Sequence, residues 1–101
     1  MASRLELQTE LETLLGSENV YYQPPSSIEM NYPAIVYSRY KIENEFANNQ
    51  VYRQLHAYQI IIIDENPDSE IVEKVSKLPK CRFDRHYVSD NLNHDAFVLY
   101  F

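Results

Sequence analysis

The chain has 101 residues, 45% hydrophobic and 24% charged, which suits one domain spanning residues 1–101 around a modest core. Its formal net charge of −6 argues against a dedicated nucleic-acid binder, because affinity for phosphates comes mainly from clustered Lys and Arg. A single cysteine, Cys81, excludes an internal disulfide framework and a multi-cysteine zinc or iron–sulfur site.

Residues 3–15 predict a helix. Ser3 and Glu6 have the spacing of a capping box, and Gly16 is suited to ending the helix. The expected buried face consists of Leu7, Leu11, Leu14 and Leu15. Residues 20–22 form a short extended segment, and the prolines at 24 and 25 then predict a polar loop.

A long hairpin is expected next, with strands at residues 34–42 and 51–64. The polar stretch 43–50, with Phe46 as its isolated large apolar residue, predicts a protruding, mobile tip that becomes ordered on assembly. Four isoleucines at 60–63 make both faces of the return strand apolar, because side chains alternate along a strand. Either the helices cover opposite faces, or a neighbouring subunit covers part of one; we favour the second.

Asn66-Pro67 predicts the start of a second helix, with Asn66 as the N-cap and Pro67 in the first turn, and Pro79 ends it. Its buried stripe would consist of Ile71, Val72, Val75 and Leu78. A final hairpin pairs residues 82–89 with 95–101. The sequence therefore predicts an α+β fold: an antiparallel sheet of four to five strands with two helices, in the order α-β-β-β-α-β-β.

The sequence contains only weak signals for a catalytic or metal site. Asp90, His94 and Asp95 could form an acid/base or metal group, but a zinc site needs three or four well-placed ligands, so we interpret them as turn and strand residues. Asp64 and Glu65 fit solvated turn carboxylates. No nucleophile–base spacing, paired-cysteine motif or glycine-rich phosphate loop is present. We expect no enzymatic activity, no cofactor and no bound metal.

Lys80, Arg82 and Arg85 form the basic cluster of the chain, with aromatic residues beside them. Such a group could bind RNA or DNA, because aromatic rings stack on bases next to phosphate-binding cations. A salt-bridged strand that faces an acidic neighbour explains the same residues, and we favour it. No apolar stretch approaches the roughly 18 residues that cross a bilayer, and no signal-peptide pattern is visible, so we expect a soluble protein without a membrane partner.

A series of segments carries a resemblance to a known family. They are Tyr32-Pro33-Ala34-Ile35-Val36-Tyr37, Ile62-Ile63-Asp64, Pro67-Asp68-Ser69, Arg85-His86-Tyr87 and Asp90-Asn91-Leu92-Asn93-His94. From Val20 onward the chain resembles small tail-terminator or head–tail joining proteins of siphophages and prophages of Gram-positive bacteria. The resemblance implies helices packed on an antiparallel sheet, and rings, commonly hexameric, that cap the tail tube and meet the head connector.

The function implied by this resemblance is that of a structural virion protein of the head–tail neck, a tail terminator or tail-completion subunit. Its partners would be further copies of itself, the tail-tube protein and head-connector or head-closure proteins. It would assemble in the bacterial host cytoplasm and reside in the neck of the virion, where DNA passes through the ring without sequence-specific binding. The alternative is a small ferredoxin-like module that binds nucleic acid or a peptide.

A ring requires a heterologous interface, in which two different surfaces of the subunit meet. We expect one surface near the long strand and the other at the hairpin tip, with charged groups setting the register. The candidate interface residues are Phe46, Tyr52, Arg53, Tyr58, Arg82 and Arg85.

Overall fold

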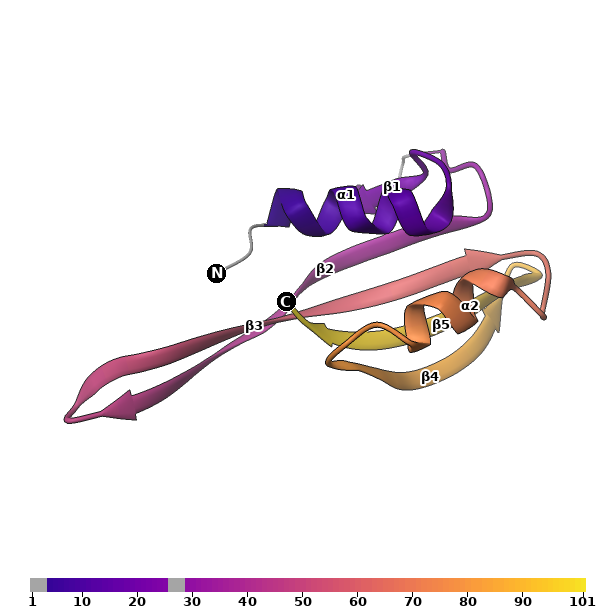
Figure 1. The fold of residues 1–101 in the computed structure, drawn as a ribbon. Helices are drawn as coiled ribbons and strands as arrows, with labels where there is room; N and C mark the ends of the chain where they lie inside the picture. Colours follow the sequence, from indigo (N-terminus) through magenta and orange to yellow (C-terminus); the bar gives the residue numbers. More distant parts are fainter. Residues whose placement is uncertain (1–3, 26–28) are drawn as a thin grey trace.

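The computed structural model describes residues 4–25 and 29–101, except for the side chains of residues 51–53 (Figure 1). Its elements are α1 (Arg4–Leu15), β1 (Val20–Tyr22), β2 (Ala34–Ala47), β3 (Gln50–Asp64), α2 (Glu70–Ser76), β4 (Cys81–Ser89) and β5 (Leu92–Tyr100). The predicted α+β class and element order are confirmed. Ser3, the expected first cap, lies outside the described residues.

The sheet has five strands in the order β1-β2-β3-β5-β4. Three neighbouring pairs are antiparallel, as expected, whereas β1 runs parallel to β2, so the sheet is mixed. A hairpin turn cannot connect parallel neighbours. Because β1 and β2 are parallel, the connection from Tyr22 to Ala34 instead leads back to the end of the sheet where β1 begins.

Two-residue turns close both hairpins. Asn48 and Asn49 have φ values of 54° and 63°, and Asp90 and Asn91 have 52° and 62°. Positive φ at both central positions gives the turn whose twist matches paired strands, and Asn and Asp tolerate it best after Gly. The expected long hairpin with its tip within residues 43–50 is confirmed, but the unpaired tip is shorter than predicted, because pairing continues up to Ala47 and Gln50. Polar side chains are compatible with this ribbon because its faces are exposed.

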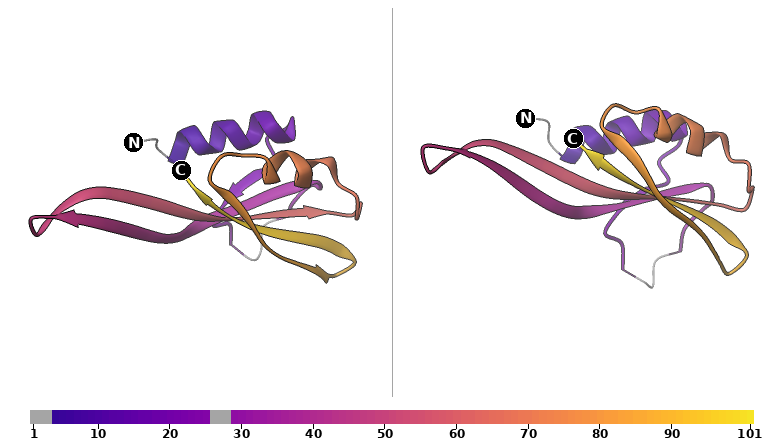
Figure 2. Two further views of the ribbon diagram at one scale, coloured as in Figure 1. Left: turned by 60° about the horizontal axis from the view of Figure 1, so that its bottom comes forward. Right: turned by 90° about the horizontal axis from the view of Figure 1, so that it is seen from below.

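Both helices lie on one face of the sheet (Figure 2). The opposite-faces arrangement is thus excluded, and the core is a single layer between the helices and the sheet. The expected stripes are confirmed: Leu7, Leu11 and Val75 are buried, and the core cluster also includes Ile35, Tyr37, Tyr58, Ile60, Ile62, Phe97 and Leu99. Tyr37 also links the helix to the sheet, since its hydroxyl donates to Oε1 of Gln8 and accepts from Nη1 of Arg4 at 3.3 Å.

The uncovered face of the sheet is apolar but built from smaller side chains near its centre. Ala34 and Ala96 are fully buried there, and Ile63 is nearly so. Val36, Ile61 and Val98 remain half-buried. Coverage of part of this face by a neighbouring subunit stays a prediction.

The second helix starts later than the sequence predicts. Asp64 and Asn66 each accept a hydrogen bond from the backbone N–H two residues ahead, at 3.0 Å, so they form consecutive side-chain turns. The N-cap is instead Ser69, whose hydroxyl accepts from Ile71 N at 3.3 Å. Gly16, at φ 80°, ends α1 as expected, and its N–H donates to Glu12 O.

These packing differences predict contrasting effects for two phenylalanines. Phe97 is 0% exposed at the centre of the core, so Phe97→Ala should lower the free energy of unfolding by about 3–5 kcal/mol. Phe46 is 66% exposed, so Phe46→Ala should change it by less than about 0.5 kcal/mol. Urea unfolding followed by circular dichroism measures both. Comparable losses for the two variants would contradict this account of the core.

Candidate subunit interface

The outer part of the β2–β3 hairpin projects beyond the rest of the sheet (Figure 1). From Tyr40 to Leu55 the two strands pair only with each other, because β1 ends opposite Tyr37 and β5 ends opposite Ala57. We call residues 40–55 the arm. It gives the molecule its elongated shape, with principal extents of 51 × 23 × 23 Å.

The arm exposes large apolar side chains. Tyr40 is 55% exposed, Ile42 is 42% exposed, and Phe46 near the tip is 66% exposed. An isolated two-stranded hairpin is marginally stable in water, since it buries little surface. The arm therefore has both the reach and the chemistry of a segment that contacts another molecule.

Polar side chains make contacts both across and along the strands of the arm. Gln54 Nε2 donates to Asn44 Oδ1 across the strands at 3.0 Å, and Gln54 Oε1 lies 2.9 Å from Nε2 of His56. Lys41 Nζ lies 2.6 Å from Glu43 Oε1. This hydrogen bond raises the pKa of Lys41 and lowers that of Glu43. Both groups are solvent-exposed, so the pair is readily exchanged for another.

β4 forms one edge of the sheet, and its Arg82 lies beside the arm root. A register shift between Phe83 and Arg85 marks a bulge at Asp84, so that Arg82 pairs with Val98 and Arg85 with Ala96. Both arginines therefore point to the uncovered face. Arg85 lies 5.2 Å from the centre of the Tyr87 ring. Within the described part of the chain neither arginine forms an ion pair.

A polar hollow of about 270 Å³ separates β4 from the arm root. Its walls include Lys41, Arg82 and Asp84, together with the rings of Tyr40 and Tyr100. Sequence reasoning grouped Arg82 with Lys80 and did not predict that the sheet brings it near Lys41. Cross-strand neighbours of this kind depend on register, which the sequence pattern left open.

The structure removes one candidate from the predicted interface. Tyr58 is only 4% exposed and packs against Tyr37 with ring centres 6.2 Å apart, so its own helices cover it. Its position on the core face, together with Ile60 and Ile62, follows from strand alternation. Phe46, Arg82 and Arg85 are exposed. The side chains of Tyr52 and Arg53 lie outside what the structure describes, so their role stays a prediction.

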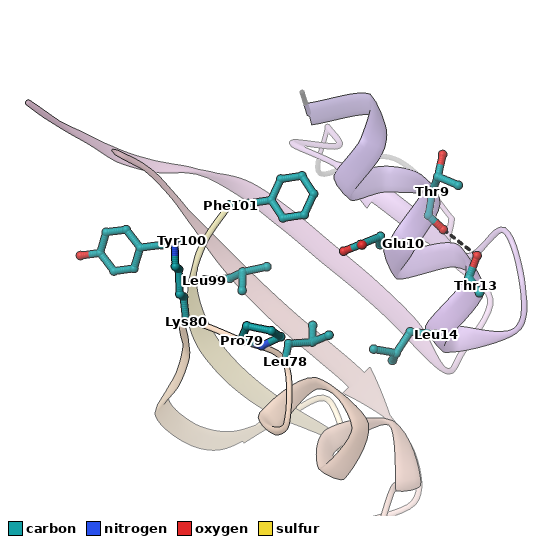
Figure 3. A pocket seen from close by; sticks show the side chains of 10 residues that line it. All are labelled: Thr9, Glu10, Thr13, Leu14, Leu78, Pro79, Lys80, Leu99, Tyr100 and Phe101. Atoms are coloured by element: carbon teal, nitrogen blue, oxygen red, sulfur yellow. Dashed lines mark hydrogen bonds between the residues drawn. The ribbon is translucent and has the colours of Figure 1, made fainter. Parts of the chain in front are cut away.

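An apolar groove of about 630 Å³ lies between α1 and the segment that follows α2 (Figure 3). Leu14 projects into it from α1 and Leu78 from the segment after α2, while Leu99 and Phe101 line the sheet side. Thr9, Glu10 and Thr13 form a polar rim on α1, where Thr13 Oγ1 donates to Thr9 O at 2.9 Å. The groove depends on how α1 and the segment after α2 pack on the sheet, which no local sequence pattern predicts.

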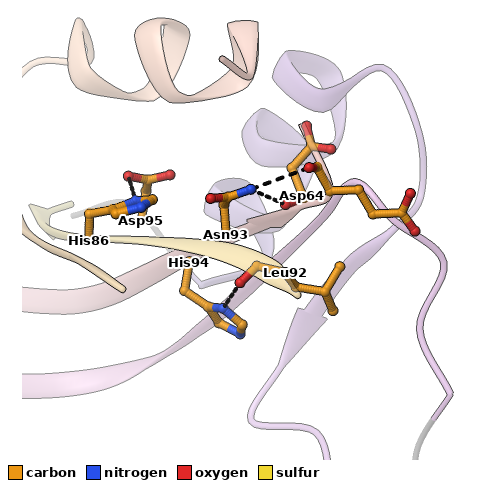
Figure 4. Close-up of polar contacts among 7 residues, drawn as sticks. Asp64, His86, Leu92, Asn93, His94 and Asp95 are labelled. Carbon is orange, nitrogen blue, oxygen red and sulfur yellow. Dashed lines mark hydrogen bonds and ion pairs between the residues drawn. The ribbon is translucent and has the colours of Figure 1, made fainter. Parts of the chain in front are cut away.

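The candidate acid/base group of the last hairpin is not brought together (Figure 4). Asp95 points toward α2 and its Oδ1 lies 2.8 Å from Nδ1 of His86, a cross-strand pair that the sequence reading missed. His94 points the other way, and its Nδ1 lies 3.0 Å from Leu92 O. Its ring stacks on that of Tyr87, with ring centres 4.7 Å apart. Asp90 occupies the turn.

Among residues 4–25 and 29–101, no three His, Cys, Asp or Glu side chains are grouped so that they could hold a metal ion. None of the helices in this same part of the chain is long and apolar enough to cross a membrane. A scan against models of known protein families found no match to the chain, and a search of curated proteins found none either.

Cys81 should react slowly as a thiol. It is half-buried at the start of β4, and burial raises the pKa of its thiol. Because the thiolate is the reactive form, a raised pKa lowers the reactive fraction at pH 8. Labelling with a chromogenic disulfide should therefore be several-fold slower in the folded chain than in urea, and should accelerate as the pH rises above 9. Equal folded and unfolded rates at pH 8 would contradict this placement.

Proposed function

We propose that the chain is a structural subunit of the head–tail neck of a long-tailed phage or prophage particle. In this role it is a tail terminator or tail-completion protein, whose ring ends growth of the tail tube and joins the tail to the head connector. The observation that carries the proposal is the arm, an uncovered two-stranded ribbon with exposed Tyr40, Ile42 and Phe46. The family resemblance supplies the biological setting.

A projecting arm suits a ring subunit for a physical reason. The surface that extends from one copy must differ from the surface that receives it, which makes the contact heterologous. Repeating such a contact with a rotation that closes generates a ring, commonly a hexamer in the proteins that the chain resembles. The apolar arm residues then become buried only in the assembly, which favours assembly over the free subunit.

The same role accounts for the acidic balance of the chain. DNA that moves through the ring must not be held there, and a net charge of −6 limits nonspecific attraction to phosphates. The remaining partners are the tail-tube protein and the head-connector or head-closure proteins. We propose no catalytic role, and we place the protein in the virion neck after assembly in the host cytoplasm.

A nucleic-acid- or peptide-binding module is the second candidate function. It is favoured by the hollow between β4 and the arm root, where Lys41 and Arg82 lie beside the rings of Tyr40 and Tyr100. The element order differs from the β-α-β-β-α-β arrangement of ferredoxin-like domains, since the described part of the β1–β2 connection holds no helix. A salt-dependent shift in the fluorescence anisotropy of a labelled oligonucleotide, lost in Arg82→Ala, would favour this alternative.

Shortening the arm should separate folding from assembly. Replacing residues 44–54 by an Asn-Gly turn joins Glu43 to Leu55, which are already paired, and leaves the core intact. The variant should melt within a few degrees of the parent. In cells that carry the phage genome without its own copy of the gene, the variant should yield unjoined heads and tails of uncontrolled length by electron microscopy.

Asn49→Gly is the matched control, because it keeps the arm at full length and suits the positive φ of that position. It should restore joined particles. Normal particles from the shortened-arm variant would exclude a role for the arm, and normal particles in the complete absence of the gene would exclude the proposed function.

A further inference from the structure

Several strand edges are left unpaired in the described structure, and two of them carry charges of opposite sign. One is the outer edge of β4, the last strand of the sheet. The other is the outer edge of β2 along the arm, beyond Arg39, whose N–H donates to the side chain of Gln23. Unpaired edges attract other strands, and proteins commonly place charges and bulges on them to block random pairing. Both features occur on β4, and the positions of its charges match those on the arm edge of another copy.

We propose that the β2 edge of the arm pairs, antiparallel, with the β4 edge of the next copy, so that the sheet continues from subunit to subunit. This inference rests on the proposed ring and specifies its interface. Backbone hydrogen bonds between added strands provide affinity, and the side chains set the register. The arm edge and the β4 edge are different surfaces, so the contact is heterologous.

Charge complementarity fixes the register. On the arm, Glu43 and Glu45 share a face because they lie two residues apart in a regular stretch. On β4, the bulge at Asp84 places Arg82 and Arg85 on one face although they lie three apart. An antiparallel pairing that keeps this bulge therefore sets Glu45 opposite Arg82 and Glu43 opposite Arg85.

The next positions distinguish antiparallel from parallel pairing. Continuing the antiparallel register sets Lys41 opposite Tyr87, where a cation can lie over an aromatic ring. A parallel arrangement can also match the glutamates with the arginines, but it sets Lys41 opposite Lys80, and like charges directly opposite are unfavourable. Antiparallel pairing satisfies every charged position on the arm edge. It also lets Glu43 exchange its exposed partner Lys41 for Arg85.

Disulfide trapping tests this register. Directly opposite residues of antiparallel strands have Cα atoms about 4.5–5.5 Å apart, inside the range of roughly 4.4–6.8 Å for disulfides. Glu45→Cys combined with Arg82→Cys, in a Cys81→Ser background, should give a ladder of covalent multimers on non-reducing electrophoresis after mild oxidation. Each copy carries both halves of the contact, so the ladder should extend beyond dimers.

The matched control is Glu45→Cys with Ser89→Cys, which places an equally exposed thiol at the other end of β4. It should give a much weaker ladder. A band pattern that stops at dimers, or ladders of equal strength from both pairs, overturns the proposal, as does a chain that remains monomeric throughout. Circular dichroism confirms that each variant retains the fold of its Cys81→Ser parent.

A second cysteine pair leaves the two glutamates and the two arginines in place, so that the effect of their charges on the contact can be measured. Lys41→Cys with Tyr87→Cys should trap the same contact. Adding Glu43→Arg and Glu45→Arg should suppress its ladder several-fold, and further adding Arg82→Glu and Arg85→Glu should restore it. Glu18→Arg with Glu65→Arg changes the charge equally at exposed turn positions and should have no effect. Suppression without restoration contradicts the proposed register.

The outcomes also separate this inference from the proposed function. A register-specific ladder from a chain whose absence leaves phage particles normal would support the interface and reject the neck role. If joined particles require the gene but neither cysteine pair forms a covalent ladder, the neck role is supported and the interface is rejected.

Discussion

The pairing of β2 with β3 is the constraint on which the rest of the molecule depends. Its inner half, from Ala34 to Arg39 opposite residues 58–63, forms the centre of the five-stranded sheet. Its outer half is a ribbon with no neighbour in the described structure. The ladder runs from the core into the arm, with a register shift between Arg39 and Lys41, so the core anchors the arm at its root. The same pairing therefore provides both stability and reach.

The core is one-sided, and its composition explains why. Large side chains such as Tyr37, Ile60 and Phe97 fill the face beneath both helices. At the centre of the other face, Ala34 and Ala96 are small enough to be buried against the sheet itself. Only a modest apolar surface remains on that side. Of the seven exposed large hydrophobic side chains in the described structure, three lie on the arm, namely Tyr40, Ile42 and Phe46, and association through the arm would bury them.

The sequence predicted what local patterns encode. Leucine spacing and Gly16 located α1, and the apolar stripe with Val75 identified the buried face of α2. The polarity of residues 43–50 led to strands that were predicted too short, because a ribbon exposed on both faces has no apolar side that would identify it as strand. Ser69 replaced Asn66 as a cap because side-chain turns extended the loop. Tyr58 was assigned to the surface because the sequence does not specify which face the helices cover.

In the proposed assembly, charges on the strand edges would have two effects. Arg82 and Arg85 disfavour pairing with an arbitrary apolar edge, since their charges would be buried without partners. The bulge disfavours such pairing because it interrupts the regular edge. Against Glu43 and Glu45 the same groups become favourable, yet each exposed ion pair contributes only about 0.2–1 kcal/mol. A single contact is therefore weak and reversible. Closing a ring makes one additional contact without ordering another subunit, so a complete ring is far more stable than an open chain of copies.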